Sequence, residues 1–316
     1  MSNSPRNRYQ NLKGSLILGI AAFIWGIAFV VQSAAADKIP PFLFNGFRSL
    51  IAAIFLLGVL GFKKIKTGHS LIPTSPADRK ALIVAGISCG LLLTVTVNFQ
   101  QFGLALYPDG VAAEARAGFI TALYVIFVPI ASIFFKKRPS PMIWLAGAVA
   151  TVGVYFLCFA GGFDHFYLGD VLVLCCSLGF TAHIMVVDAY GDRVDGITLS
   201  MLQFLICGIL STLISFSCES MTWSNLPAVI PHLLYMGILS SGIAYTLQII
   251  GQKYAEPAVA SIVMSLESAF AALGGWVLLS NALSPREFWG CALVFAAILL
   301  AQLPQLWSKK RTNTPE

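Results

Sequence analysis

Glu267 is the residue with the clearest potential for chemistry in this sequence. It lies near the middle of residues 257–280, which are otherwise apolar apart from hydroxyl groups. About 20 helical residues cross a hydrocarbon core roughly 30 Å thick. A carboxylate at that depth costs on the order of 2.5 kcal/mol or more, so it should face protein or a water-filled cavity. Three roles are open: a proton acceptor that couples proton entry to solute movement, a ligand for a solute amine, or a structural hydrogen bond between helices.

Three further ionisable residues fall inside apolar stretches. Arg48 lies about seven residues, or ~10 Å, from the end of its stretch. Its guanidinium either extends to the membrane surface, binds a solute carboxylate or pairs with Glu114. Arg116 lies near the end of a later stretch, where it serves either an extracellular gate or interfacial solvation. His183 either exchanges protons near neutral pH or packs between helices.

Uncharged polar residues are unusually dense in the apolar stretches. Thr94, Asn98 and Gln101 recur at positions i, i+4 and i+7 and so share one helical face, and residues 245, 248 and 252 do likewise. Two such faces favour a central cavity for a polar, zwitterionic or amphipathic solute, although each residue singly also suits a bond between helices. The residues expected to line the cavity are Trp25, Gln32, Thr94, Asn98, Gln101, Thr121, Tyr124, Tyr245 and Gln248.

The composition indicates a protein embedded in a lipid bilayer. The 316 residues are 57% hydrophobic and 11% charged, with a mean hydropathy of +0.80, whereas soluble domains carry about 25% charged residues. We therefore predict an all-α polytopic membrane protein. The net charge of +6 comes from basic residues in short loops, which argues against a nucleic-acid partner. The seven cysteines show no CxxC and no Cys/His ligand spacing, so neither a metal site nor another cofactor is predicted.

The hydropathy pattern predicts ten transmembrane helices. They lie at about 14–36, 41–61, 79–104, 111–135, 141–160, 168–189, 197–217, 228–252, 257–280 and 285–306. Lys and Arg cluster at the chain ends and in alternate connections, and only Lys38 and Arg286 fall on the other side. Because cytoplasmic loops are enriched in Lys and Arg, both termini are predicted to be cytoplasmic.

The order of the spans repeats within the chain. Residues 14–60 align with 169–215, which places Trp25 over Phe180. Five spans in each half mean that the second half enters the membrane from the opposite side, an arrangement that puts a solute site near the midplane. The predicted inverted repeats are residues 1–162 and 163–316.

Several blocks of sequence resemble a known family. The WG pair at 25–26, NGFRSLIAAIFLL at 45–57 and FITALYVIFVPIASIFFKKRPSPMIWLAGA at 119–148 resemble the first EamA repeat of the drug/metabolite transporter superfamily, and 265–303 resembles the second. The resemblance covers nearly the whole chain. It implies a ten-helix inverted-repeat carrier in the bacterial inner membrane, often an exporter of amino acids or other small metabolites. The family commonly keeps a Glu at the position of Glu267 whatever the solute.

These features favour a secondary transporter that works by alternating access, with proton coupling as one source of energy. No GxxxxGK[ST] loop is present, so this chain does not split ATP, and no GxSxG or HExxH motif suggests an enzyme. The alternatives are an uncoupled facilitator or channel, and a non-transporting membrane receptor. Stripes of small residues suit helix packing within a monomer or across a homodimer, and the sequence leaves both open.

Overall fold

The computed structural model describes residues 8–36, 38–68, 73–108, 113–158, 166–220, 223–279 and 284–307, and no strand occurs among them. The all-α prediction is therefore confirmed for these residues. The first half of the chain, up to residue 158, contains α1 (Arg8–Ala36), α2 (Pro41–Thr67), α3 (Pro76–Ala105), α4 (Ala113–Ala122), α5 (Tyr124–Phe134) and α6 (Pro141–Cys158). The second half, from residue 166, contains α7 (Leu168–Tyr190), η1 (Gly191–Arg193), α8 (Gly196–Cys218), η2 (Trp223–Asn225), α9 (Leu226–Leu234), the π-helix η3 (Tyr235–Ala244), α10 (Tyr245–Gln252), α11 (Pro257–Met264), α12 (Leu266–Leu279) and α13 (Pro285–Trp307).

The helices are long and apolar enough for a polytopic membrane protein. Among the described residues, seven helical segments suffice by length and composition to cross a bilayer, and residues 141–157 and 257–271 form shorter apolar helices. The count of ten transmembrane helices stays a prediction. The predicted boundary between residues 162 and 163 lies outside the described residues.

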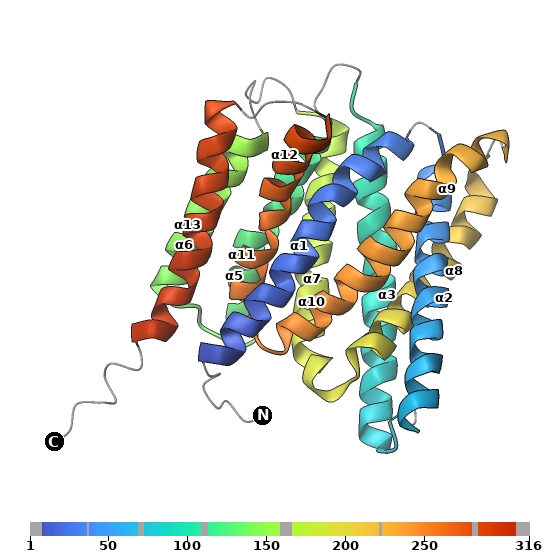
Figure 1. Cartoon of the computed structure of the whole chain (residues 1–316), viewed down its shortest axis with the longest axis horizontal. Coiled ribbons are helices and arrows are strands. Elements are labelled where there is room, and N and C mark those ends of the chain that lie inside the picture. Colours follow the sequence, from blue (N-terminus) through green and yellow to red (C-terminus); the bar gives the residue numbers. More distant parts are fainter. Residues whose placement is uncertain are drawn as a thin grey trace.

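The helices run roughly side by side, and their ends define two faces of the bundle (Figure 1). The start of α1 and the end of α13 lie at the same end, together with the end of α2 and the start of α3 (Figure 1). We call this the basic end, because it carries Lys63, Lys137, Arg193 and Lys253 near the helix ends.

Two predicted helices are interrupted at matching places. The span expected at 111–135 breaks at Leu123 between α4 and α5, and the span expected at 257–280 breaks at Ser265 between α11 and α12. Leu123 has φ −60° and ψ −12°, and Ser265 has φ −62° and ψ −11°, which is the tighter geometry of a 3₁₀ turn. The third difference is in the span expected at 228–252, whose middle is the π-helix η3.

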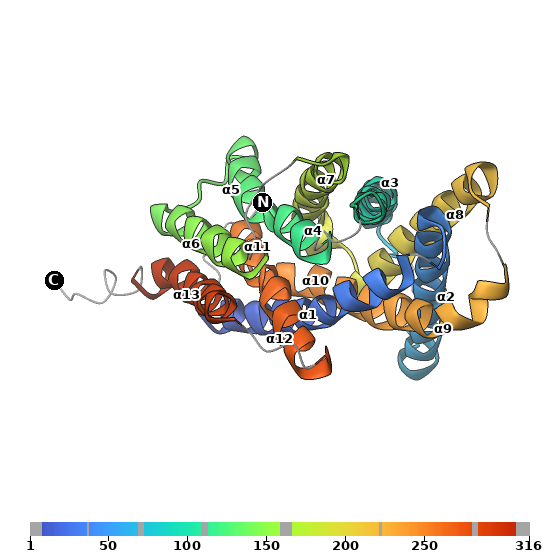
Figure 2. The ribbon, with the colours of Figure 1, turned by 90° about the horizontal axis from the view of Figure 1, so that it is seen from above.

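The two halves of the chain interleave instead of forming separate bundles. Helix α2 packs on α8, α3 on α7 and α8, and α6 on α13, while α1 packs on α10 and α12. Seen from above, the α6–α13 pair stands at one side and α2, α8 and α9 at the other, with α1, α4, α7, α10 and α11 between them (Figure 2).

Glycines allow these helices to approach closely. A Cβ at Gly153 would lie 2.9 Å from the Gly290 carbonyl oxygen, and one at Gly290 would lie 2.8 Å from the Gly153 oxygen, so α6 and α13 touch backbone to backbone. A Cβ at Gly14 in α1 would lie 3.0 Å from the Gly251 oxygen in α10. Lipid tails are as apolar as side chains, so close packing of small residues replaces the hydrophobic effect in helix association.

A side chain added between α6 and α13 should destabilise the fold. We expect Gly153→Leu to reduce the free energy of unfolding by about 1–3 kcal/mol, because the backbone of α13 cannot yield locally. The matched control is Gly58→Leu in α2, where a Cβ meets nothing within 4 Å. Thermal unfolding of the purified variants in detergent measures the difference, and equal losses in both would contradict this account of the contact.

Candidate functional site

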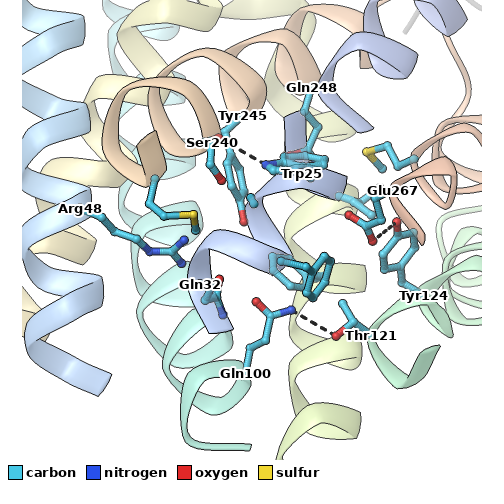
Figure 3. Close-up of a pocket in the computed structure, with 16 residues that line it drawn as sticks. Trp25, Gln32, Arg48, Gln100, Thr121, Tyr124, Ser240, Tyr245, Gln248 and Glu267 are labelled. Carbon is cyan, nitrogen blue, oxygen red and sulfur yellow. Dashed lines mark hydrogen bonds between the residues drawn. The ribbon is translucent and has the colours of Figure 1, made fainter. Parts of the chain in front are cut away.

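A cavity lies between helices of the two halves. It contains about 580 Å³ of space free of protein atoms, part of it continuous with the exterior. Helices α1 to α5 of the first half and α7, η3, α10, α11 and α12 of the second contribute to its wall. The lining residues are Trp25, Ala28, Phe29, Gln32, Arg48, Gln100, Thr121, Tyr124, Phe180, Ile184, Met236, Ser240, Tyr245, Gln248, Met264 and Glu267 (Figure 3).

Glu267 lies in the wall of this cavity and bonds to a residue of the other half. Its side chain is buried, and the Tyr124 hydroxyl donates to Glu267 Oε1 at 2.9 Å. Both residues follow the matching helix breaks, Tyr124 directly after Leu123 and Glu267 two positions after Ser265. Glu267 is thereby in the first turn of α12, where the helix dipole favours a negative charge. The hydrogen bond to a tyrosine does not decide between the structural and functional roles, because the carboxylate also faces the cavity.

Arg48 is the cation of the cavity. Its side chain is directed from α2 toward the cavity centre (Figure 3), and the residue is only 4% exposed. The Phe44 ring lies 5.8 Å from its Cζ. Among the described residues no group bonds to its buried Nε. The side chain of Glu114, the other partner considered for Arg48, lies outside the described residues.

The WG pair of α1 positions an aromatic wall. Trp25 Nε1 donates to the Ser240 carbonyl oxygen in the π-helix η3 at 3.3 Å, and its ring meets Tyr245 edge to face at 4.9 Å. A Cβ at Gly26 would lie 2.8 Å from the Glu267 carbonyl oxygen, so only glycine lets α1 approach α12 here. The pair therefore holds α1 against η3, α10 and α12, three of the second-half elements that supply cavity residues.

Three glutamines add hydrogen-bonding groups to the wall. Gln100 Nε2 donates to Thr121 Oγ1 at 3.2 Å. In the described part of the chain, Gln32 Nε2 and Gln248 Oε1 have no partner although both atoms are buried. The cavity therefore presents a donor and an acceptor that a polar solute or water could satisfy.

Three predicted cavity residues lie elsewhere. Thr94, Asn98 and Gln101 are buried but are not among the residues that line the cavity. Asn98 Nδ2 donates to Ser211 Oγ of α8 at 2.9 Å, and Asn98 Oδ1 accepts from Asn45 Nδ2 of α2 at 3.0 Å. This arrangement places Asn98 in a bonded contact among α2, α3 and α8.

Arg116 is buried in an ion pair away from the cavity lining. Its Nε and one terminal nitrogen donate to the two carboxylate oxygens of Asp170 at 2.6 and 2.7 Å, joining α4 to α7. The Tyr107 hydroxyl also donates to Asp170 at 2.8 Å, and burial and this hydrogen bond raise the pKa of Tyr107 well above its usual range. Asp170 did not stand out in the sequence. Its position three residues after Tyr167, with which it forms a capping box, was the available signal.

His183 also lies outside the cavity lining. Its ring is fully buried, Nε2 lies 3.0 Å from Gln203 Oε1, and the ring meets Tyr245 edge to face at 6.0 Å. His183 thus packs behind a residue of the cavity wall. Other residues that line the cavity but were not predicted to do so include Phe180, Met236 and Ser240. Phe180 had a signal, because it aligns with Trp25 in the repeat.

Comparisons with known proteins place this architecture in a family. The chain belongs to the EamA-like transporter family, whose model matches residues 12–159 and again residues 167–303. The repeated match and the apolar helices make it a multi-pass membrane protein.

Relatives match along most of the chain. It is 29% identical over 300 residues to an uncharacterized transporter of Archaeoglobus fulgidus. This match covers 93% of this chain and 87% of the other protein. It is 26% identical to the uncharacterized inner membrane transporter YedA of Escherichia coli, over 89% of this chain and 87% of that one. A solved crystal structure with 20% identity has the same fold, with a TM-score of 0.75 over 96% of this chain and 99% of the other.

The buried ion pair should matter far more for stability than an exposed one. We expect Asp170→Asn to leave Arg116 buried without its counterion and to cost about 3–5 kcal/mol in the free energy of unfolding. The matched control is Asp78→Asn, since the Asp78–Arg193 pair is 3.3 Å long with side chains 40% and 51% exposed, and such pairs contribute about 0–1 kcal/mol. Thermal unfolding compares the two, and similar losses would contradict the importance of burial.

Proposed function

We propose that this protein is a secondary transporter that exports small polar metabolites such as amino acids by alternating access. The carrying observation is the cavity, which both halves line and which presents a guanidinium, a carboxylate and unpartnered amide groups. A binding site shared by two structural repeats is typical of secondary transporters, because motion of one half against the other exposes the site to each side in turn.

Symmetry of the two halves supports this mechanism. The proposed architecture is ten transmembrane helices in two inverted repeats, residues 1–162 and 163–316. The helix breaks at Leu123 and Ser265 have the same backbone geometry. The start of α1 contacts the end of α10 through Gly14 and Gly251, and the start of α7 contacts the end of α3 through Gly169 and Gly103. These contacts are equivalents if α1 matches α7 and α3 matches α10.

The charges in the cavity support a zwitterionic solute. Arg48 suits a carboxylate, while Glu267 suits an ammonium group through the oxygen that Tyr124 does not occupy. Protonation of Glu267 would couple transport to a proton gradient, because neutralising the carboxylate removes its attraction for the solute. Export is the direction that the family resemblance favours.

The orientation follows from charge. We propose that the basic end faces the cytoplasm and that both termini lie there. The proposed location is the cell (inner) membrane, which the words "inner membrane" in the name of the Escherichia coli relative support. Among the described residues, exposed apolar side chains on α2, α8 and α13, including Ile54, Leu213 and Trp289, suit contact with lipid. A monomer and a homodimer are both compatible with the mechanism.

Uptake into proteoliposomes tests the proposal. We expect saturable flux of at least one amino acid or related metabolite, driven by an imposed pH gradient and lost in Glu267→Gln. Glu256→Gln is the control, because Glu256 is exposed at the basic end just before α11 and should leave flux unchanged.

Other outcomes would replace parts of the proposal. Equal flux in Glu267→Gln and the native protein would make Glu267 a structural residue bonded to Tyr124. Absence of counterflow with linear, unsaturable flux would indicate a channel or facilitator. No flux of any metabolite by well-folded protein would favour a receptor.

A further inference from the structure

We propose that Arg48 binds the carboxylate of the transported solute and that the solute joins this carboxylate to an apolar body. This inference rests on the proposed carrier function and narrows its solutes from small polar metabolites to amphipathic carboxylates. Under this proposal the solute needs a carboxylate in order to bind, and it does not need an amine.

The first observation is that Arg48 is buried and has no counterion among the described residues. It is only 4% exposed, and its Nε is buried with no hydrogen-bond partner in the described part of the chain. An uncompensated charge away from water is costly, and a guanidinium presents paired N–H groups that match a carboxylate. Because the side chain reaches the cavity, an anion entering there would supply the missing partner (Figure 3).

Arg116 shows how this fold treats an arginine that has a structural role. Arg116 is 6% exposed, about as buried as Arg48. It donates two hydrogen bonds to the Asp170 carboxylate, at 2.6 and 2.7 Å. The same protein therefore pairs one buried arginine with a fixed carboxylate and leaves the other facing a cavity. Because no carboxylate among the described residues pairs with Arg48, an acid that enters the cavity would supply one.

Glu267 does not serve as that counterion. It accepts a hydrogen bond from the Tyr124 hydroxyl, and no ion pair joins it to Arg48 in the described structure. Figure 3 shows the two side chains on opposite sides of the cavity, with the Trp25 and Tyr245 rings among the groups between them. One oxygen of Glu267 already has a donor, so a solute amine would add to binding without being required for it.

The rest of the wall favours an apolar body. Trp25, Phe29, Phe180, Ile184, Met236 and Met264 all line the cavity. Aromatic rings provide large apolar contacts, and the flexible thioethers of methionine adapt to bodies of different shape. A solute that is polar along its whole length would leave this surface without partners, whereas an amphipathic acid would cover it and still reach Arg48.

Binding to the purified protein in detergent, measured by isothermal titration calorimetry, tests this directly. The probes are linear, branched and phenyl-substituted monocarboxylates, their α-amino acids and the corresponding amides. We expect acids to bind and each amide to bind about 30-fold more weakly or worse, the range seen when one partner of a buried charge pair is removed. Removing the α-amino group should change affinity less than removing the carboxylate charge.

Variants at position 48 separate a binding role from a structural one. Arg48→Gln should abolish the preference for acids over amides, and Arg48→Lys should retain part of it, because an ammonium keeps the charge but not the paired donors. Arg79→Gln, at an exposed arginine in the first turns of α3, is the control and should bind like the native protein. Because Arg48 forms no ion pair within the described part of the chain, Arg48→Gln should keep or raise the unfolding temperature. A large fall in that temperature would show that Arg48 is structural.

Several results would overturn the inference. Amides that bind as well as acids would exclude a carboxylate site, and so would acids that bind Arg48→Gln unchanged. Chloride or acetate that displaces the apolar acids at equal concentration would mean a site for small anions only. If none of the acids binds the native protein, the assignment fails. If acids bind through Arg48 but no flux occurs in proteoliposomes, the carrier function is refuted and the carboxylate site is kept. If amides are transported, the carboxylate site is refuted and the carrier function is kept.

Discussion

The structure depends on one constraint, which is that polar groups inside a bilayer have no water to bond and must find partners within the protein. Asp170 shows the constraint satisfied, since its carboxylate accepts from Arg116, from Tyr107 and from the backbone N–H of Tyr167. Glu267 finds Tyr124 across the boundary between the halves. Arg48 Nε and Gln32 Nε2, at the cavity, are buried with no hydrogen-bond partner in the described part of the chain, and our proposal is that an entering solute supplies one.

The same constraint explains why irregular backbone gathers around the cavity. The π-helix η3 gives the Ser240 carbonyl to the indole of Trp25, and the tight turns at Leu123 and Ser265 precede Tyr124 and Glu267. Departures from α-helical geometry release backbone groups, and these are tolerated where they are buried in protein or line a water-accessible space. These local distortions of the helices thus direct side chains toward the cavity.

Close backbone contacts hold this arrangement together. In lipid, helices gain little from hiding apolar surface, so contact depends on shape. Gly26 brings α1 against the backbone of α12, and Gly153 and Gly290 bring α6 against α13. Glycines also join the start of α1 to the end of α10 and the end of α3 to the start of α7.

Hydropathy along the chain was enough to locate the apolar helical stretches. A segment that crosses a bilayer must bond its own backbone as a helix, and the hydrocarbon core requires mostly apolar side chains. The sequence also indicated half of the residues that line the cavity, since charged and amide side chains such as Arg48, Gln248 and Glu267 stand out in apolar stretches. The packing of the folded chain sets which helix faces meet, and the sequence pattern does not reveal it. Thr94, Asn98 and Gln101 share a face as predicted, but α8 supplies Ser211 opposite Asn98, and Arg116 has its partner in Asp170, 54 residues further along. Helical periodicity predicts which residues share a face of a helix, but it does not predict which other helix packs on that face. Contacts between residues far apart in the sequence depend on how the helices pack.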